Sequence, residues 1–185
     1  MKENRYRLGV SQARPYRTYF GTVGLFERLE VNARVTEIMG VPGFNYSQAY
    51  GDYKDKAVDV KLQLLPEGKY TPAVALAILD PHGTRVFPSQ AIVASKQIYP
   101  FDFTVGFGNG RLGKRSLPSQ GEGFGLELFE NPRGWWRDAQ VFGGVQFALS
   151  DRFALVAEYS PIRYERQTND PAQKKYFPGP VPSRI

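Results

Sequence analysis

The sequence predicts an all-β protein that forms an antiparallel, up-and-down outer-membrane β-barrel, complete or incomplete. In most extended segments apolar residues alternate with polar ones, so each predicted strand has one apolar and one polar face. We count about nine such segments of about ten residues, whereas strands of soluble proteins average about five or six residues. The connections alternate between short and long, as the turns and loops of outer-membrane barrels do.

The first four strands are expected in the N-terminal part of the chain. Two extended segments, Arg5–Ser11 and Tyr16–Leu25, are rich in the aromatic and β-branched residues that strands favour. The third strand alternates Leu29, Val31, Ala33 and Val35 with Glu30, Asn32, Arg34 and Thr36. The fourth alternates Val58, Val60, Leu62 and Leu64 with Asp59, Lys61 and Gln63. Both patterns predict an apolar face opposite a charged face.

Five further strands follow, and in some of them the second face is small rather than charged. They are expected at Ala73–Leu79, Gln90–Ile98, Phe101–Gly108, Val141–Leu149 and Phe153–Ser160. No segment offers an apolar helical stripe with a cap, and Gly or Pro interrupts nearly every connection. We therefore expect a single barrel domain or barrel fragment over residues 1–185.

The connections place turns at one end of the sheet and loops at the other. The short ones are Phe26–Arg28, Pro66–Thr71, Tyr99–Pro100 and Ser150–Arg152. The long ones are Met39–Asp55, Asp80–Ser89, Gly110–Asp138 and Pro161–Pro182. Aromatic residues near both ends predict the two girdles of a membrane barrel: Phe26, Tyr70, Tyr99 and Phe153 near turns, and Tyr16, Phe87, Tyr159 and Tyr164 near loops.

Composition excludes several classes of protein. The longest apolar run, Ala73–Leu79, is far shorter than the roughly 18 residues of a membrane-spanning helix. The chain has no Cys and one His, so a disulfide framework, a thiol nucleophile and a metal-ligand cluster are not expected. The net charge of +6 is spread among 24 basic and 18 acidic residues, and we expect no nucleic-acid partner.

Two motifs suggest catalysis or cofactor binding but lack the necessary context. Gly108–Gly113 matches GxGxxG, yet Pro118, Gly121 and Gly123 prevent the helix that a dinucleotide site needs. His82 lies in a turn sequence, and no serine is placed by spacing as its partner. We therefore expect a protein without enzymatic activity and without a cofactor.

The loop around two tryptophans is the candidate glycan contact. Sugar rings stack on flat aromatic faces, while Arg and Asp hydrogen-bond sugar hydroxyls. The candidate residues are Arg133, Trp135, Trp136, Arg137 and Asp138. The alternative is that the two Trp side chains are anchors at the membrane interface, a position that Trp favours.

The polar faces of the strands are expected to line the lumen of the barrel. A charge against lipid at mid-bilayer costs about 2 to 4 kcal/mol for Arg or Lys, so these side chains must point inward. The candidates are Glu30, Asn32, Arg34, Asp59, Lys61, Gln63, Gln146 and Glu158. Their mixed charges predict a wet or salt-bridged interior.

Three runs of sequence resemble the YjbH family of exopolysaccharide-associated outer-membrane proteins of Gram-negative bacteria. They are RPYRTYFGTVGLFERLEVNARVTEI, ASKQIYPFDFTVGFGNGRLG and LSDRFALVAEYSPIRYE. The resemblance implies an outer-membrane barrel that serves the production or export of a surface polysaccharide, with no catalytic residues to transfer. The expected partners are outer-membrane lipid and polysaccharide or other proteins of the exopolysaccharide system. Family members are longer and begin with a leader that this chain lacks, so we expect a fragment.

Two other functions remain open at this point. A porin-like diffusion channel would have the same strands and the same two faces. A soluble lipocalin-like carrier would use the same alternation with its apolar face turned inward, and a period of two cannot separate these arrangements. Strand length and loop asymmetry favour the membrane barrel.

Overall fold

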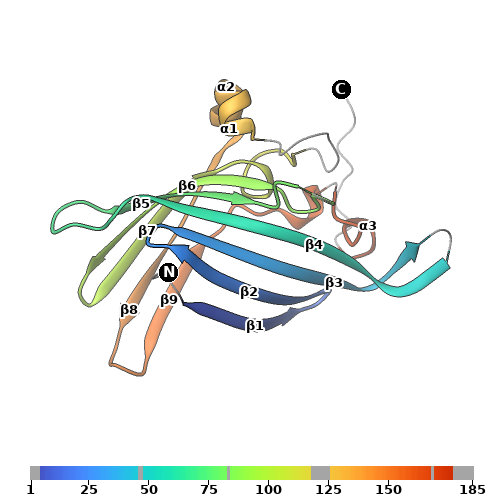
Figure 1. Ribbon diagram of the computed structural model, residues 1–185, viewed down its shortest axis with the longest axis horizontal. Coiled ribbons are helices and arrows are strands. Elements are labelled where there is room, and N and C mark those ends of the chain that lie inside the picture. The colour runs from blue at the N-terminus through green and yellow to red at the C-terminus, as the bar shows by residue number, and fades with distance from the viewer. Residues whose placement is uncertain (1–4, 46–47, 83, 118–125, 168, 177–185) are drawn as a thin grey trace.

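The computed structural model describes residues 5–45, 48–82, 84–117, 126–167 and 169–176, which form one nine-stranded antiparallel sheet in the order β1 to β9 (Figure 1). The strands are β1 Tyr6–Ala13, β2 Tyr16–Phe26, β3 Leu29–Asn45, β4 Gln48–Leu65, β5 Ala73–Leu79, β6 Ser89–Ile98, β7 Phe101–Gly108, β8 Gln140–Ala148 and β9 Ala154–Tyr159. The helices are η1 Gly110–Leu112, α1 Glu127–Glu130, α2 Pro132–Asp138, η2 Tyr164–Arg166 and α3 Gln173–Tyr176. The predicted up-and-down antiparallel sheet is confirmed.

The strand register aligns the two predicted faces across the sheet. Residues opposite each other in an antiparallel ladder point to the same face. One continuous row of partners is Leu29, Leu62, Leu76, Ile92, Phe107 and Val141. The row next to it is Glu30, Lys61, Ala77, Ala91, Gly108 and Gln140. The sheet therefore has one apolar face and one polar or small face.

Most of the apolar face is uncovered, and the polar face holds much of the buried structure. Leu8 on β1 is 78% exposed and Leu155 on β9 is 61% exposed. On the polar face, Thr36 and Asp55 are buried. This distribution is the reverse of that in a soluble sheet, in which the apolar side faces the core.

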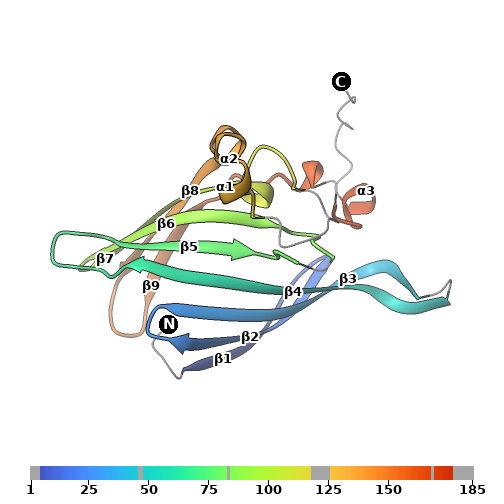
Figure 2. The same ribbon diagram turned by 45° about the horizontal axis from the view of Figure 1, so that its top comes forward.

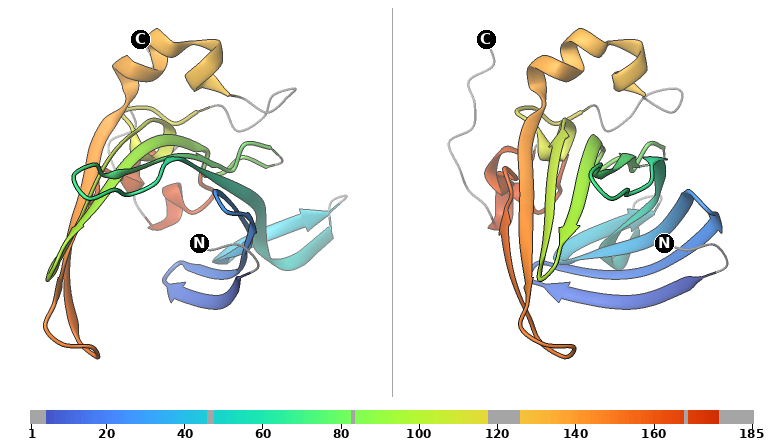
Figure 3. Two further views of the ribbon diagram at one scale, coloured as in Figure 1. Left: turned by 60° about the vertical axis from the view of Figure 1, so that its left-hand side comes forward. Right: turned by 90° about the vertical axis from the view of Figure 1, so that its left-hand side faces the viewer.

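The sheet is strongly curved, and its edges are not joined. Figure 3 shows an arch with η2 and α3 on its concave side. In the part of the chain that the structure describes, β1 pairs only with β2 and β9 only with β8. The sequence predicted a barrel that is either complete or incomplete. The described residues form an open sheet that does not close into a barrel.

The prediction of a long connection at Met39–Asp55 is wrong, because most of these residues belong to β3 and β4. β3 has 17 residues and β4 has 18, and their hairpin projects beyond the rest of the sheet (Figure 2). The register shifts around Pro42, and Gly40 and Gly51 have φ angles of +77° and +103°. These irregularities bend the hairpin and interrupt the alternation of faces, which is why the sequence pattern indicated a loop.

The expectation of no helix is wrong for the connections at the loop end. In α2, Pro132 stands in the first turn and the Asn131 side chain accepts a hydrogen bond of 3.0 Å from the Gly134 N–H. These are the usual signals of a helix start, but seven residues are too few for an apolar stripe. No helix among the described residues is long and apolar enough to span a membrane.

Of the eight aromatic residues predicted to form two girdles, the exposed ones lie mainly at the turn end of the sheet. At the turn end, Phe26, Tyr70, Tyr99 and Phe153 are all well exposed. At the loop end, Tyr159 is exposed on the apolar face. The prediction is wrong for Tyr16, Phe87 and Tyr164, which pack against one another over the polar face.

Candidate functional site

The polar face is covered at the loop end by what we call the cap. The cap comprises the described residues of the segments 80–88, 109–117 and 160–176. Its segments bind one another: the Arg111 N–H donates to the Pro88 carbonyl at 3.1 Å, and the Asn169 side chain donates to the Leu117 carbonyl at 2.6 Å. Connections far apart in sequence thus form one layer on the concave side of the sheet.

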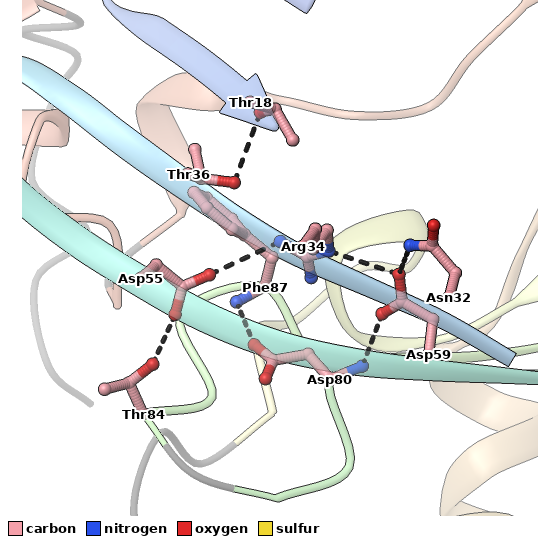
Figure 4. A network of polar contacts seen from close by, with 9 residues as sticks. All are labelled: Thr18, Asn32, Arg34, Thr36, Asp55, Asp59, Asp80, Thr84 and Phe87. Carbon is pink, nitrogen blue, oxygen red and sulfur yellow. Dashed lines mark hydrogen bonds and ion pairs between the residues drawn. The ribbon is translucent and has the colours of Figure 1, made fainter. Parts of the chain in front are cut away.

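An ion network centred on Arg34 lies beneath the cap (Figure 4). The Arg34 guanidinium lies 3.3 Å from the Asp55 carboxylate and 3.2 Å from the Asp59 carboxylate. β3 and β4 place these groups together because Arg34 pairs with Ala57, between the two aspartates on the same face. Asn32 donates a further 2.8 Å hydrogen bond to Asp59.

The same network fastens the segment 80–88 to the sheet. The Asp80 N–H donates to the Asp59 carboxylate at 3.0 Å, and the Asp80 carboxylate accepts from the Phe87 N–H at 2.9 Å. The Thr84 hydroxyl donates to Asp55. Two carboxylates, Asp55 and Asp59, therefore share one guanidinium, and the Asp80 carboxylate lies near them in a largely buried setting.

Asp80 is the group through which we expect the cap to respond to pH. Burial, with help from the nearby carboxylates of Asp55 and Asp59, raises the pKa of Asp80 from 3.8 to about 6, against the opposing effects of Arg34 and the Phe87 N–H. The folded protein thus holds this proton more tightly than the unfolded chain does. The resulting stability is complete below about pH 4 and is lost as the pH rises through about 6.

We expect hydrogen exchange in segment 80–88, corrected for its intrinsic pH dependence, to show weaker protection at about pH 7.5 than at about pH 4.5. Asp80→Asn should remove this difference, because the neutral amide keeps the acceptor for the Phe87 N–H. Identical pH profiles for the wild type and the variant would contradict the assignment to Asp80.

A second cluster under the cap combines rings with a guanidinium. Tyr16 and Phe87 meet edge to face at 5.9 Å, and the Tyr16 hydroxyl donates to Asp170. The Arg111 guanidinium lies 4.2 Å from the Phe87 ring centre and 5.7 Å from that of Tyr164. A hollow of about 250 Å³ lies between this cluster and Arg34. Its rings, hydroxyls and charges can bind a polar ligand such as a sugar.

All eight predicted lumen residues lie on the polar face, in two groups. The group on β3 and β4 begins beneath the cap, where Asn32, Arg34 and Asp59 belong to the ion network. Toward the turn end, Lys61 pairs with Glu30 at 3.2 Å and Gln63 follows on the same face. On β8 and β9, Gln146 and Glu158 line a separate hollow of about 380 Å³. That this face encloses an aqueous lumen remains a prediction.

The two tryptophans lie on the apolar side of the sheet rather than near the hollow. The Phe107 ring, on the apolar face, is 5.7 Å from Trp135 and 4.7 Å from Trp136. Trp135 is buried and Trp136 is 66% exposed. This packing favours the alternative reading of interfacial anchors, and glycan contact by this loop remains an untested prediction.

The charged neighbours of the tryptophans lie at both ends of α2, Arg133 near its start and Arg137 and Asp138 at its end. The Arg137 guanidinium donates two hydrogen bonds to Asp138, at 3.1 and 3.2 Å, and these hydrogen bonds lower the pKa of the Asp138 carboxyl. Arg133 is exposed. Glycan contact by Arg133, Arg137 and Asp138 stays a prediction.

We expect Trp136→Ala to leave the fold intact while weakening retention of the protein in lipid bilayers. The change removes an exposed ring whose pairing with Phe107 contributes about 0.5 to 1.5 kcal/mol. The measurement is flotation with liposomes, with binding of purified polysaccharide as the second readout. Lost polysaccharide binding with unchanged flotation would favour the glycan contact instead.

The remaining motifs have no catalytic geometry. Gly108 ends β7, and the next residues form the three-residue helix η1, so the GxGxxG match does not begin a dinucleotide-binding helix. His82 lines a hollow on the outer side of β1–β4. Among the described residues, no three His, Cys, Asp or Glu side chains are placed to hold a metal ion.

Sequence reasoning missed Asp55, Asp80, Tyr16 and Arg111 as members of the site. The first three contribute through long-range contacts; Tyr16 and Asp170, for example, are separated by 154 positions. Arg111 carried a weak signal, because it belongs to the short basic cluster with Lys114 and Arg115.

Comparison with known proteins gives a consistent result over nearly the whole chain. The family model for YjbH, described as "Exopolysaccharide biosynthesis protein YbjH", matches residues 1–179. The "Uncharacterized lipoprotein YjbH" of Escherichia coli (strain K12) is 32% identical over 187 residues, which cover 89% of this chain and 26% of that protein. The chain thus spans about a quarter of the length of this relative. No solved structure matches it.

Proposed function

The chain belongs to the YjbH family, whose description is exopolysaccharide biosynthesis, and from this premise we propose that it is a non-enzymatic outer-membrane β-barrel component of exopolysaccharide production and export. One observation carries the proposal. Most of the apolar face is uncovered, and both edge strands expose apolar side chains on it, while the ion pairs and the cap lie on the polar face.

A lipid bilayer is the environment that best suits the exposed apolar face of this sheet. Soluble monomers rarely expose apolar patches larger than a few hundred Å², yet here exposed Leu, Val and Phe side chains occur from β1 to β9. In hydrocarbon, the unpaired backbone groups at the sheet edges would be costly, so β1 and β9 must pair with each other or with further strands. The proposal therefore includes closure of the barrel.

The polar face supports a role in handling a hydrophilic polymer. Its cap encloses a hollow of about 250 Å³ lined by hydroxyls, guanidinium groups and rings. Such groups interact with the hydroxyls and ring faces of sugars. We propose that the barrel either passes glycan or anchors partner proteins of the same system, in the outer membrane of a Gram-negative bacterium. The lipoprotein name of the Escherichia coli relative supports a place in the cell envelope.

A porin-like diffusion channel is the second candidate, because mixed charges line the polar face. The cap argues against a wide open pore, since it lies over that face at the loop end. A soluble carrier is disfavoured by the exposure of the apolar face.

Fractionation of cells that produce the native protein tests the proposal. We expect the protein in the outer membrane, extracted only by detergent, with heat-modifiable migration on a gel and with loss of surface polysaccharide when its gene is deleted. Recovery in the soluble fraction without detergent would overturn the membrane assignment. Steady conductance in planar bilayers with unchanged polysaccharide would favour the diffusion channel.

A further inference from the structure

We propose that the apolar face of β1–β4 carries a binding site for an anionic lipid, with acyl chains in a trough on this face and the phosphate at a basic rim. The inference rests on the proposed function, because it requires this face to meet a bilayer. A hollow of about 1060 Å³ lies on β1–β4, with Pro81 and His82 also in its lining, and its volume is slightly above the roughly 300 to 1,000 Å³ usual for ligand pockets.

The trough follows from the size of the side chains in one row of the sheet. The row runs Leu8, Gly21, Ala33 and Val58 across β1–β4. Its two central residues are small, so the outer ones form walls above a low floor. A Cβ added to Gly21 would lie 3.1 Å from the Leu8 side chain, which shows how closely the wall borders the floor.

The next two rows become charged toward the loop end. One row ends at the exposed Lys56, after Val10, Tyr19 and Val35. The row beyond it is Gln12, Arg17, Glu37 and Lys54. Successive rows on one face are two residues apart, about 6.8 Å along the strand. The basic rim therefore lies directly beside the end of the trough.

The rim has an excess of positive charge. Arg17 and Lys54 both lie 3.6 Å from the single carboxylate of Glu37, and Lys56 adds a third cation. A phosphate is recognised by cations of this kind, and a basic side chain at an anionic membrane surface contributes about 1 kcal/mol. An apolar trough that ends at a net positive rim complements a molecule with acyl chains and an anionic headgroup.

Lipid selectivity in discs tests the site. The protein is placed in bilayer discs of equal parts phosphatidylcholine and phosphatidylglycerol, extracted with mild detergent, and its retained lipids are counted by native mass spectrometry. We expect the wild type to retain phosphatidylglycerol preferentially. Lys54→Gln with Lys56→Gln should reduce that preference about fivefold per lysine, and Gly21→Leu should reduce the total lipid retained by filling the trough.

Lys69→Gln is the matched control, because Lys69 is an exposed lysine in the β4–β5 turn at the opposite end of the sheet. It should leave the preference unchanged. Equal retention of both lipids by the wild type, or an unchanged preference in the double variant, would overturn the lipid site alone. Failure of the wild type to enter discs would overturn both the site and the membrane barrel on which it rests.

Discussion

Replacing Leu62 by arginine is expected to prevent stable assembly in the membrane. Leu62 lies within the apolar row between Leu29 and Leu76 and is 40% exposed on the uncovered face. An Arg directed at lipid costs up to about 2 to 4 kcal/mol, the value at the bilayer midplane. That is a large part of the roughly 5 to 15 kcal/mol by which a folded domain is stable. The measurement is the fraction of heat-modifiable protein in the outer membrane.

The neighbouring residue provides a matched control. Gln63 lies one position further on the same strand and points to the polar face. Gln63→Arg introduces the same charged side chain on the polar face, where its neighbours are polar. This variant should assemble nearly as well as the wild type. Equal losses for Leu62→Arg and Gln63→Arg would mean that the apolar face does not meet lipid.

This pair of variants also tests the part of the fold that the sequence predicts best. Alternation alone predicted the third and fourth strands and the face of each residue, because a period of two is a local property of an extended chain. The same reasoning failed for Met39–Asp55. Bulges around Pro42 and the positive φ angles of Gly40 and Gly51 interrupt the alternation while the ladder continues.

The cap could not be predicted for a different reason. Asp80 binds the sheet through Asp59, and Tyr16 binds the C-terminal segment through Asp170. These contacts join residues that no local pattern relates, and they depend on the curvature that brings the loops over the concave side (Figure 3). Arg34 and Asp59 were correctly assigned to one face, but alternation does not say which charges meet there.

The two faces therefore depend on different interactions. The described residues leave most of the apolar face uncovered, apart from the part near Phe107 that α2 covers, and in our proposal the bilayer covers the rest. The polar face is organised within the chain by ion pairs that the cap shields from water. A charge added to the apolar face should affect insertion into the membrane, whereas a charge removed from the polar face should affect the cap.

Arg34→Gln is expected to release the cap and to destabilise the sheet by about 3 to 5 kcal/mol, the cost of leaving buried charges without their partner. The Arg34 side chain is 14% exposed, and its partner Asp55 is fully buried. Without the guanidinium, the carboxylates of Asp55 and Asp59 face each other and Asp80. We expect faster proteolysis within segment 80–88 and a lower temperature for the heat-modifiable transition in detergent.

Two further variants separate loss of this network from loss of any charge on the polar face. Lys61→Gln breaks the pair with Glu30, but the Lys61 side chain is 48% exposed, so the loss should be about 0 to 1 kcal/mol. Adding Asp55→Asn and Asp59→Asn to Arg34→Gln should restore much of the stability, since a neutral buried cluster no longer contains repelling charges. If Arg34→Gln costs no more than Lys61→Gln, the ion network does not hold the cap, and the curvature of the sheet must position it instead.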